Sequence, residues 1–190
     1  MKHITFTLTI FLITILVYPS AWSKDKILSF FENSKDEVKI TANKIEARFT
    51  SDGYEVIFIG KVRGEQGPLS MKCDKLVLYF KDKGTKKNSG SSTPSLQSED
   101  LDNLRSAKAN GNVIVVYKKT MASSEKLTYD SVKRTVTFTG GKPKMWQGPH
   151  AIIADMIIIY LDENRIDVKR GKDEPISFTI NPSREGKEKK

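Results

Sequence analysis

The sequence predicts an all-β protein built from repeats of about thirty residues, and three observations support this prediction. Val-, Ile-, Phe- and Tyr-rich runs alternate with polar residues almost everywhere after residue 37, as at 135–139 and 176–180. No stretch beyond residue 37 sustains an apolar stripe at helical spacing. A short motif also recurs at a regular interval, and a set of glycines keeps step with it.

The recurring motif is a small residue, a polar residue and then an apolar alternation. It occurs four times, with the polar positions Asn43, Asp74, Glu125 and Asp155. The first interval is 31 residues and the last is 30, whereas the middle interval of 51 contains a Lys-, Ser- and Gly-rich segment at 81–102. Discounting that segment as an inserted flexible loop restores the period. The chain therefore reads as stacked units that share one apolar interior.

Four glycines follow the polar positions by 16 or 17 residues once the insertion is discounted; they are Gly60, Gly111, Gly141 and Gly171. We expect these glycines at bends or bulges that need positive φ or close backbone approach. Asn43, Asp74 and Asp155 are expected at strand bends, where short polar side chains bond to nearby backbone. The two halves also match directly, because 67–79 resembles 148–160 at a distance of 81 residues.

Period-two alternation assigns an inner, apolar face to the strands. The predicted lining residues of this face, including four placed by the resemblance described below, are Val38, Ile40, Val56, Phe58, Met71, Leu76, Leu78, Ile114, Val116, Leu127, Tyr129, Val136, Phe138, Ile152, Ile157 and Ile159. Two runs, 113–117 and 152–159, lack alternation and are expected to be covered on both faces, by protein or by ligand. The pattern leaves open whether this face packs into a closed core or admits acyl chains.

The N-terminus has the features of a secretory signal peptide over residues 1–23. Lys2 precedes an apolar run at 4–17, and Ala21 and Ser23 form a small-x-small cleavage motif. Spanning a bilayer takes roughly 20 residues, more than this run provides, so we expect cleavage, with an uncleaved anchor as the alternative. The remaining divisions are an N-terminal segment at 24–35, one β-domain at 36–181 and a disordered basic tail at 182–190.

Charge and composition narrow the function. The net charge is +9, which favours an anionic partner, and export makes nucleic acid the least suitable one. Cys73, the only cysteine, alternates with polar residues and is expected to be a buried hydrophobe. After the signal segment His150 is the only histidine, and no metal-ligand spacing, nucleophile elbow or phosphate-binding loop is present. We therefore expect no catalytic residue, no metal and no cofactor.

Several segments in order resemble the LptA/OstA-like family of periplasmic lipopolysaccharide transport proteins. They are 38–43, 56–62, 69–78, 109–114 and 151–160, and the resemblance covers most of residues 36–180. It implies an open-ended β-jellyroll, a folded V of about sixteen antiparallel strands, with lipid A acyl chains inside. It also places Val38, Ile40, Ile114 and Val116 in the lipid-binding groove.

The resemblance further implies partners. Lipopolysaccharide is carried from the inner to the outer membrane, and edge strands at both ends associate head to tail. The neighbours are further copies, an anchored jellyroll at the inner membrane and the jellyroll of an outer-membrane translocon. Two alternatives remain: an LptC-like jellyroll anchored in the inner membrane by an uncleaved N-terminal helix, or a structural β-repeat protein that binds only protein partners.

Overall fold

The computed structural model describes residues 36–81, 103–171 and 176–180, and this part of the chain is all-β. The predicted fold class is therefore confirmed. The expected signal peptide at 1–23, the segment at 24–35, the inserted loop beyond Lys81 and the tail at 182–190 lie outside the described residues. Within the described ranges, no helix is long and apolar enough to cross a membrane.

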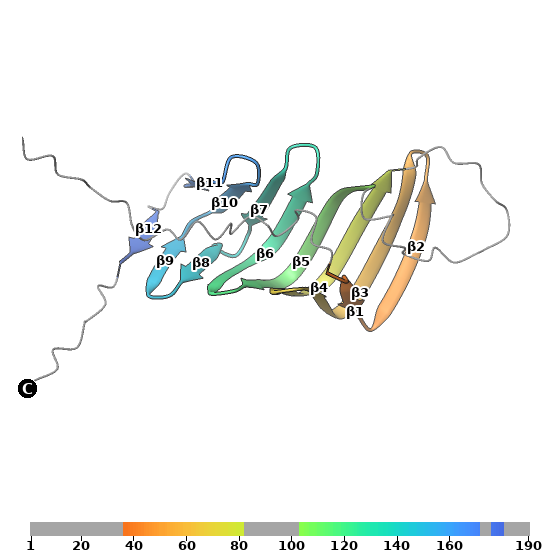
Figure 1. The fold of residues 1–190 in the computed structure, drawn as a ribbon, viewed down its shortest axis with the longest axis horizontal. Helices are drawn as coiled ribbons and strands as arrows, with labels where there is room; N and C mark the ends of the chain where they lie inside the picture. Colours follow the sequence, from red (N-terminus) through yellow and green to blue (C-terminus); the bar gives the residue numbers. More distant parts are fainter. Residues whose placement is uncertain (1–35, 82–102, 172–175, 181–190) are drawn as a thin grey trace, which may run out of the picture.

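The described residues form twelve strands (Figure 1). In chain order they are β1 (Lys39–Thr41), β2 (Lys44–Thr50), β3 (Gly53–Gln66), β4 (Leu69–Lys81), β5 (Leu104–Tyr117), β6 (Thr120–Asp130), β7 (Thr135–Thr139), β8 (Lys144–Gln147), β9 (His150–Ile153), β10 (Met156–Tyr160), β11 (Arg165–Lys169) and β12 (Ser177–Thr179). All the pairings between them are antiparallel.

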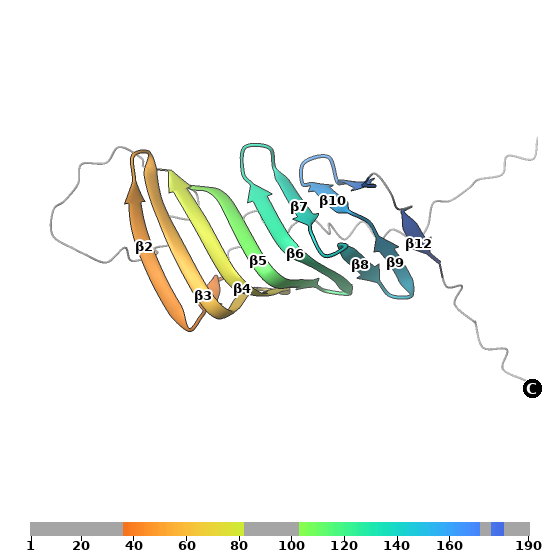
Figure 2. The ribbon, with the colours of Figure 1, turned by 180° about the vertical axis from the view of Figure 1, so that it is seen from behind.

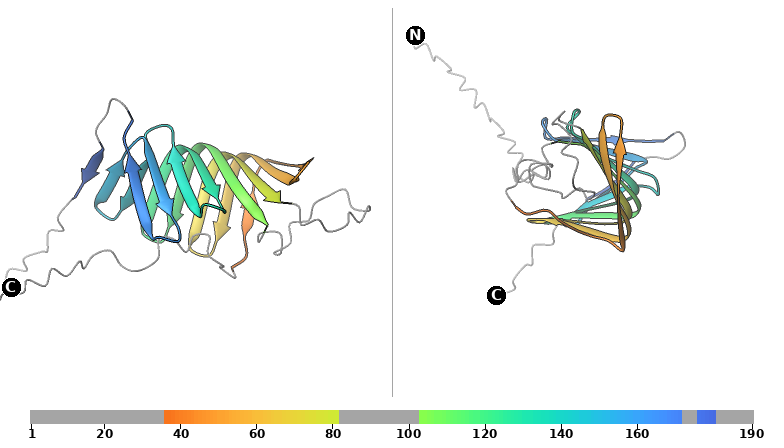
Figure 3. Two further views of the ribbon diagram at one scale, coloured as in Figure 1. Left: turned by 90° about the horizontal axis from the view of Figure 1, so that it is seen from above. Right: turned by 90° about the vertical axis from the view of Figure 1, so that its right-hand side faces the viewer.

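The strands form one sheet that is folded lengthwise into a V of two walls (Figure 3, right). We call the layer in the order β2-β3-β4-β5-β6-β7-β10-β11 the first wall, and the layer β1-β3-β4-β5-β6-β8-β9-β12 the second wall. The four long strands β3 to β6 cross the fold and belong to both walls. Each wall thus contains eight strand segments, which accounts for the expected number of about sixteen.

The line along which the walls meet, here called the crease, is made by β-bulges. Pairing of β3 with β4 shifts register after Ile59, and pairing of β5 with β6 shifts after Asn110. At these points Gly60 and Lys61 have φ of 79° and 49°, and Gly111 and Asn112 have 76° and 48°. Because two residues face one on the neighbouring strand, each long strand bends sharply there.

The polar residues of the sequence repeat all lie on the crease, each beside a glycine of the neighbouring segment. The contacts are Asn43 N–H to Gly60 O at 2.9 Å, Asn112 Nδ2 to Asp74 Oδ2 at 2.8 Å, Glu125 N–H to Gly140 O at 3.1 Å, and Gly171 N–H to an Asp155 carboxylate oxygen. The prediction that Asn43, Asp74, Asp155 and the glycines mark bends is confirmed, and the structure places Glu125 at an equivalent position. Gly171 differs from the other three in that its φ is not positive.

The insertion leaves the repeat undisturbed because of where it occurs. It joins β4 to β5 at the lip of the first wall, meaning the free margin opposite the crease. The backbone N–H of Lys81 donates to the carbonyl of Asn103 at 3.0 Å, which closes the strand pair at this point. Neighbouring lip turns are joined by ion pairs, Asp52 with Arg105 at 3.5 Å and Arg134 with Asp162 at 3.0 Å.

Cys73 is buried next to the crease, as the sequence predicted. Loss of solvation on burial, with a smaller contribution from the nearby Asp74 charge, raises the pKa of its thiol from 9.0 to about 11. The folded protein therefore holds this thiol in its neutral, unreactive form.

Replacing the crease glycine Gly111 with Ala should destabilise the fold by about 3 kcal/mol, from both a strained φ and overlap of the new Cβ with the Asp74 carboxylate. Gly148 is the matched control, because its φ is 58° but a Cβ there would meet nothing within 4 Å. Gly148→Ala should cost only about 1 kcal/mol. Urea unfolding measures both changes, and equal losses would contradict the role of the crease contact.

Thiol labelling should modify Cys73 only after unfolding. Since its pKa is raised in the folded state, the unfolded chain loses this proton first as the pH rises past 9.0. The contribution of Cys73 to stability is therefore complete below that pH and declines toward pH 11. The Cys73→Ala variant should therefore lose less stability than the native protein as the pH rises from 9.0 to 11. Rapid labelling of the folded native protein would contradict the prediction, because it would show that the thiol is accessible.

Candidate functional site

Two rows of mainly apolar side chains run along the inner face of the first wall, from one end of the V to the other. Directly paired residues share a face, so the register defines each row. The row nearer the crease is Ile45, Phe58, Leu76, Ala109, Leu127, Phe138, Ile157 and Val168. The row nearer the lip is Ala47, Val56, Leu78, Ala107, Tyr129, Val136, Ile159 and Ile166.

A third row lies opposite, on the inner face of the second wall. It consists of Ile40, Gly64, Met71, Val115, Ala122, Met145, Ile152 and Phe178. Members of all three rows belong to one core cluster, so the two inner faces pack toward each other. None of the three rows contains a charged residue, and a continuous apolar surface therefore runs the length of the V.

The structure brings thirteen of the sixteen predicted lining residues together on this inner face. They are Ile40, Val56, Phe58, Met71, Leu76, Leu78, Leu127, Tyr129, Val136, Phe138, Ile152, Ile157 and Ile159. Val38 lies two residues before Ile40, half-buried and just outside β1. The shared face is observed directly, whereas contact with lipid stays a prediction for every one of them.

Ile114 and Val116 are corrections, because both lie on the outer face. Ile114 pairs with Lys72 and Ser123, and its side chain is 40% exposed. The inward positions of this strand are Val113 and Val115, which are 0% and 3% exposed. The run 113–117 is apolar on both faces, so its composition cannot say which side is inside. Ala107 and Ala109 point inward earlier in the same strand. Continuing their period-two alternation past the crease would have placed Val113 and Val115 on the inner face, as observed.

The second run without alternation, 152–159, turns out to be two strands on different walls. β9 ends at Ile153 and β10 begins at Met156, with the crease residue Asp155 between them. Ile152 and Ile157 point inward, while Ile153 is on the outer face. The described part of the chain does not itself cover the outer side of the second wall, where Ile114 is 40% exposed, so covering of this side by a ligand or partner stays a prediction.

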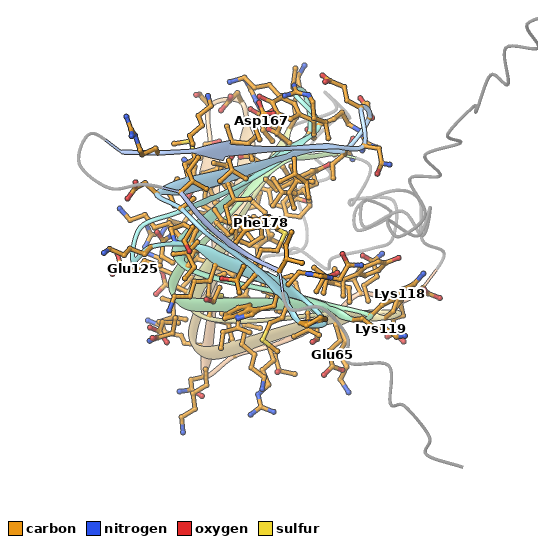
Figure 4. The ribbon with its side chains drawn as sticks, turned by 90° about the vertical axis from the view of Figure 1, so that its left-hand side faces the viewer. Glu65, Lys118, Lys119, Glu125, Asp167 and Phe178 are labelled. Atoms are coloured by element: carbon orange, nitrogen blue, oxygen red, sulfur yellow. The ribbon has the colours of Figure 1, made fainter. Side chains whose placement is uncertain are left out.

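Both ends of the V leave inner-face residues uncovered. β2 lies at one end and β12 at the other (Figure 2). Ile45 and Phe49 of β2 are exposed, and Phe178 of β12 is 53% exposed (Figure 4). Among the described residues, β1, β2, β11 and β12 each have a strand neighbour on one side only. Edge strands of this kind can accept a further strand.

Two lysines mark the free margin of the second wall. Lys118 and Lys119 form the turn between β5 and β6, on the side away from Glu125 at the crease (Figure 4). The ammonium group of Lys118 lies 5.4 Å from the ring centroid of Tyr117. A cation–π contact of this type holds the charge beside the apolar interior without burying it.

The inner surface is suited to binding apolar groups. The described residues contain no group of three or more His, Cys, Asp or Glu that could hold a metal. Asp74 and Asp155 could be considered as an acid/base pair, but each is bonded to a different residue of the crease. Asp74 accepts a hydrogen bond from Asn112, and Asp155 accepts one from Gly171. His150 is exposed at the start of β9.

The fold and sequence are both similar to known proteins, although no curated protein matches the sequence. Nineteen chains of solved structures match. One is the crystal structure of LptH, the LptA-homologous periplasmic component of the lipopolysaccharide transport device from Pseudomonas aeruginosa, with a TM-score of 0.56 and 14% identity over 78% of this chain and 98% of LptH. This likeness shows that the fold is the jellyroll of that protein.

The sequence comparison goes further. The family described as "LptA/(LptD N-terminal domain) LPS transport protein" matches residues 39–165. That range contains most of both walls, the crease and ten of the twelve strands in full. The chain therefore belongs to the LptA/LptD N-terminal domain family of lipopolysaccharide transport proteins, which are carriers rather than enzymes.

Proposed function

We propose that this chain works in the periplasm as a bridge subunit that holds the acyl chains of lipid A while lipopolysaccharide moves from the inner to the outer membrane. The observation that carries this proposal is the uncharged inner surface, which continues from β1 and β2 to β11 and β12. Membership in the transport family supports it, and so does the likeness to LptH, a protein described as periplasmic.

Acyl chains are suited to this surface because the three rows run along the V rather than across it. Burying hydrocarbon gains about 0.8 kcal/mol per methylene group, so a few exposed residues suffice for useful affinity. Most first-wall members of the rows are buried, so acyl chains reach them where the walls separate. Half-buried residues of the second wall, such as Met71 and Ile152, are the first to become available.

The phosphate groups of lipid A would lie at the open side of the V. Lys118 and Lys119 project from the margin of the second wall, where a phosphate could meet them while the acyl chains point inward (Figure 4). Charge-assisted contacts of ammonium groups with phosphate are stronger than neutral hydrogen bonds. These lysines would thereby orient the lipid without contributing to the apolar surface.

Head-to-tail association would extend the same surface through several subunits. The outer-face row that starts at Glu46 of β2 ends at Asp167 of β11. Pairing the β11 and β12 edges of one copy with the β2 and β1 edges of the next continues every row. The jellyrolls of an anchored inner-membrane partner and of the outer-membrane translocon would dock by the same edges.

The alternative functions make different demands on the chain. An anchored, LptC-like subunit requires that residues 1–23 remain attached, so sequencing the N-terminus of the protein isolated from cells distinguishes it from an exported carrier. A purely structural β-repeat requires only a packed interior. Binding of lipid A to the inner face separates that alternative from both transport roles.

Ile152→Asp should weaken binding of lipid A about ten-fold, because one buried apolar side chain of this size is worth roughly 1.5–3 kcal/mol. The matched control is Ile153→Asp, since Ile153 is the next residue on the same strand and points outward. Displacement of a fluorescent acyl probe by dilute lipid A measures both, and the melting temperature checks folding. Equal affinities of the two variants would contradict lipid binding on the inner face.

Cysteines introduced at Glu46 and Asp167 should form disulfide-linked oligomers when both are present in one chain. The native Cys73 is buried and does not compete. Lys108→Cys with Asp167→Cys is the control, because Lys108 lies in the same row but in the middle of the sheet. Non-reducing gels after mild oxidation would show a ladder only for the end-to-end pair, and monomers for both pairs would contradict head-to-tail association.

A further inference from the structure

The outer face of the second wall carries an apolar patch that transport along the inner face does not use. The patch, here called the outer patch, consists of Ile114, Val116, Met121, Trp146, Ala151 and Ile153. Val116, Met121, Trp146 and Ala151 are successive partners in one cross-strand row. Ile114 and Met121 are 40% and 42% exposed, and the remaining members are half-buried.

The strands that carry the outer patch hold mostly basic residues, whereas the crease beside them carries the exposed carboxylates of Asp74, Glu125 and Asp155. Lys72 pairs with Ile114, and Lys144 pairs with Ile153, so both lysines lie on this same face beside the patch. Lys39 and Arg63 continue the basic series toward β1, and both are exposed. The only acidic residue in the strand segments of the second wall is Glu65, at the far end of this face (Figure 4).

The first wall has a different outer surface, which serves as an internal comparison. Its acidic residues neutralise nearby cations: Glu46 pairs with Lys44 at 2.7 Å and Arg48 at 2.9 Å, and Asp167 pairs with Arg165. These contacts lower the pKa of Glu46, chiefly through hydrogen bonds from Lys44 and then Arg48. The outer face of the first wall also carries basic residues, among them Lys75, Lys108 and Lys126. Among the described strands, the second wall is distinguished by Ile114 and Met121, large apolar side chains that are exposed on the same outer face as its lysines.

We propose that the outer face of the second wall is a docking surface for an anionic lipid bilayer. The patch residues and the lysines beside them share one face of the wall, so they can meet a membrane surface together. Indole and thioether side chains enter the headgroup region readily, and each lysine near an anionic surface adds about 1 kcal/mol. Docking in this way leaves the inner face and both edges available.

The charge pattern selects a bilayer over a protein as the occupant. A protein partner would have to present acids facing Lys72, Lys144 and Arg63 at separate places along the wall. A layer of phosphate headgroups provides negative charge everywhere at once, and its acyl region accepts Met121 and Trp146. The proposal does not depend on lipid A binding, because the two surfaces lie on opposite sides of the same strands.

The test uses sedimentation of the exported protein, from which the expected signal peptide 1–23 has been removed, with vesicles of equal parts phosphatidylcholine and phosphatidylglycerol, against phosphatidylcholine alone. Lys72→Gln with Lys144→Gln should weaken binding to the anionic vesicles by about ten-fold or more. Lys75→Gln with Lys126→Gln is the matched control, because these exposed lysines lie on the outer face of the first wall. Met121→Glu probes the apolar contribution, and all variants keep the inner face intact.

Trp146 provides a second readout. The sequence has two tryptophans, and Trp22 lies in the expected signal peptide, so Trp146 is the only tryptophan of the exported protein. Its emission should shift to shorter wavelength with anionic vesicles and be quenched by brominated lipid. The proposal is overturned if the native protein fails to bind anionic vesicles, if both lysine pairs weaken binding equally, or if Trp146 stays in water while the protein is bound. Retained lipid A binding in the Lys72/Lys144 variant separates this outcome from any failure of the transport role.

Discussion

The whole architecture depends on how closely the backbone of one strand approaches a polar side chain of the next at the crease. A Cβ placed on Gly60 would lie 2.9 Å from Asn43 Nδ2, and one on Gly111 would overlap the Asp74 carboxylate. Glycine at these points lets two residues in the left-handed region oppose one on the neighbouring strand. Because the bulges stand in line, every long strand bends at the same place, and one sheet becomes two facing walls.

The bend also decides which side chains the walls present. Strands β3 and β5 keep their alternation across the crease, so Val56 and Val62 both point inward, as do Ala109 and Val113. In β4 and β6 the phase changes, and Cys73 and Leu76 point inward although they are three residues apart. The four acids and amides of the crease therefore shape the apolar surface without being part of it.

Much of this arrangement could be predicted from the sequence, because the residues that recur in the sequence repeat are the residues that form the crease. Asn43, Asp74 and Asp155 were expected at bends, Glu125 was recognised as the equivalent repeat position, and the glycines that accompany them followed from the spacing. Clean alternation, as at Val136 and Phe138, assigned the inner face correctly. Ile114 and Val116 were misplaced because a strand that is apolar on both faces carries no alternation, and the facing of such a strand depends on its neighbours' register. The outer patch follows from the same ambiguity, since its members resemble core residues until Lys72 and Lys144 are seen beside them.

The repeat unit has a consequence for the length of the molecule. Each unit crosses the crease twice and pairs only with its immediate neighbours, so its packing does not depend on units farther away. Residues 125–154 form one such unit, which enters on Glu125 and leaves just before Asp155. Duplicating a segment of this kind would lengthen the conduit by a fixed step while preserving its cross-section. Evolution could in this way match the reach of a single subunit to the distance it has to cover.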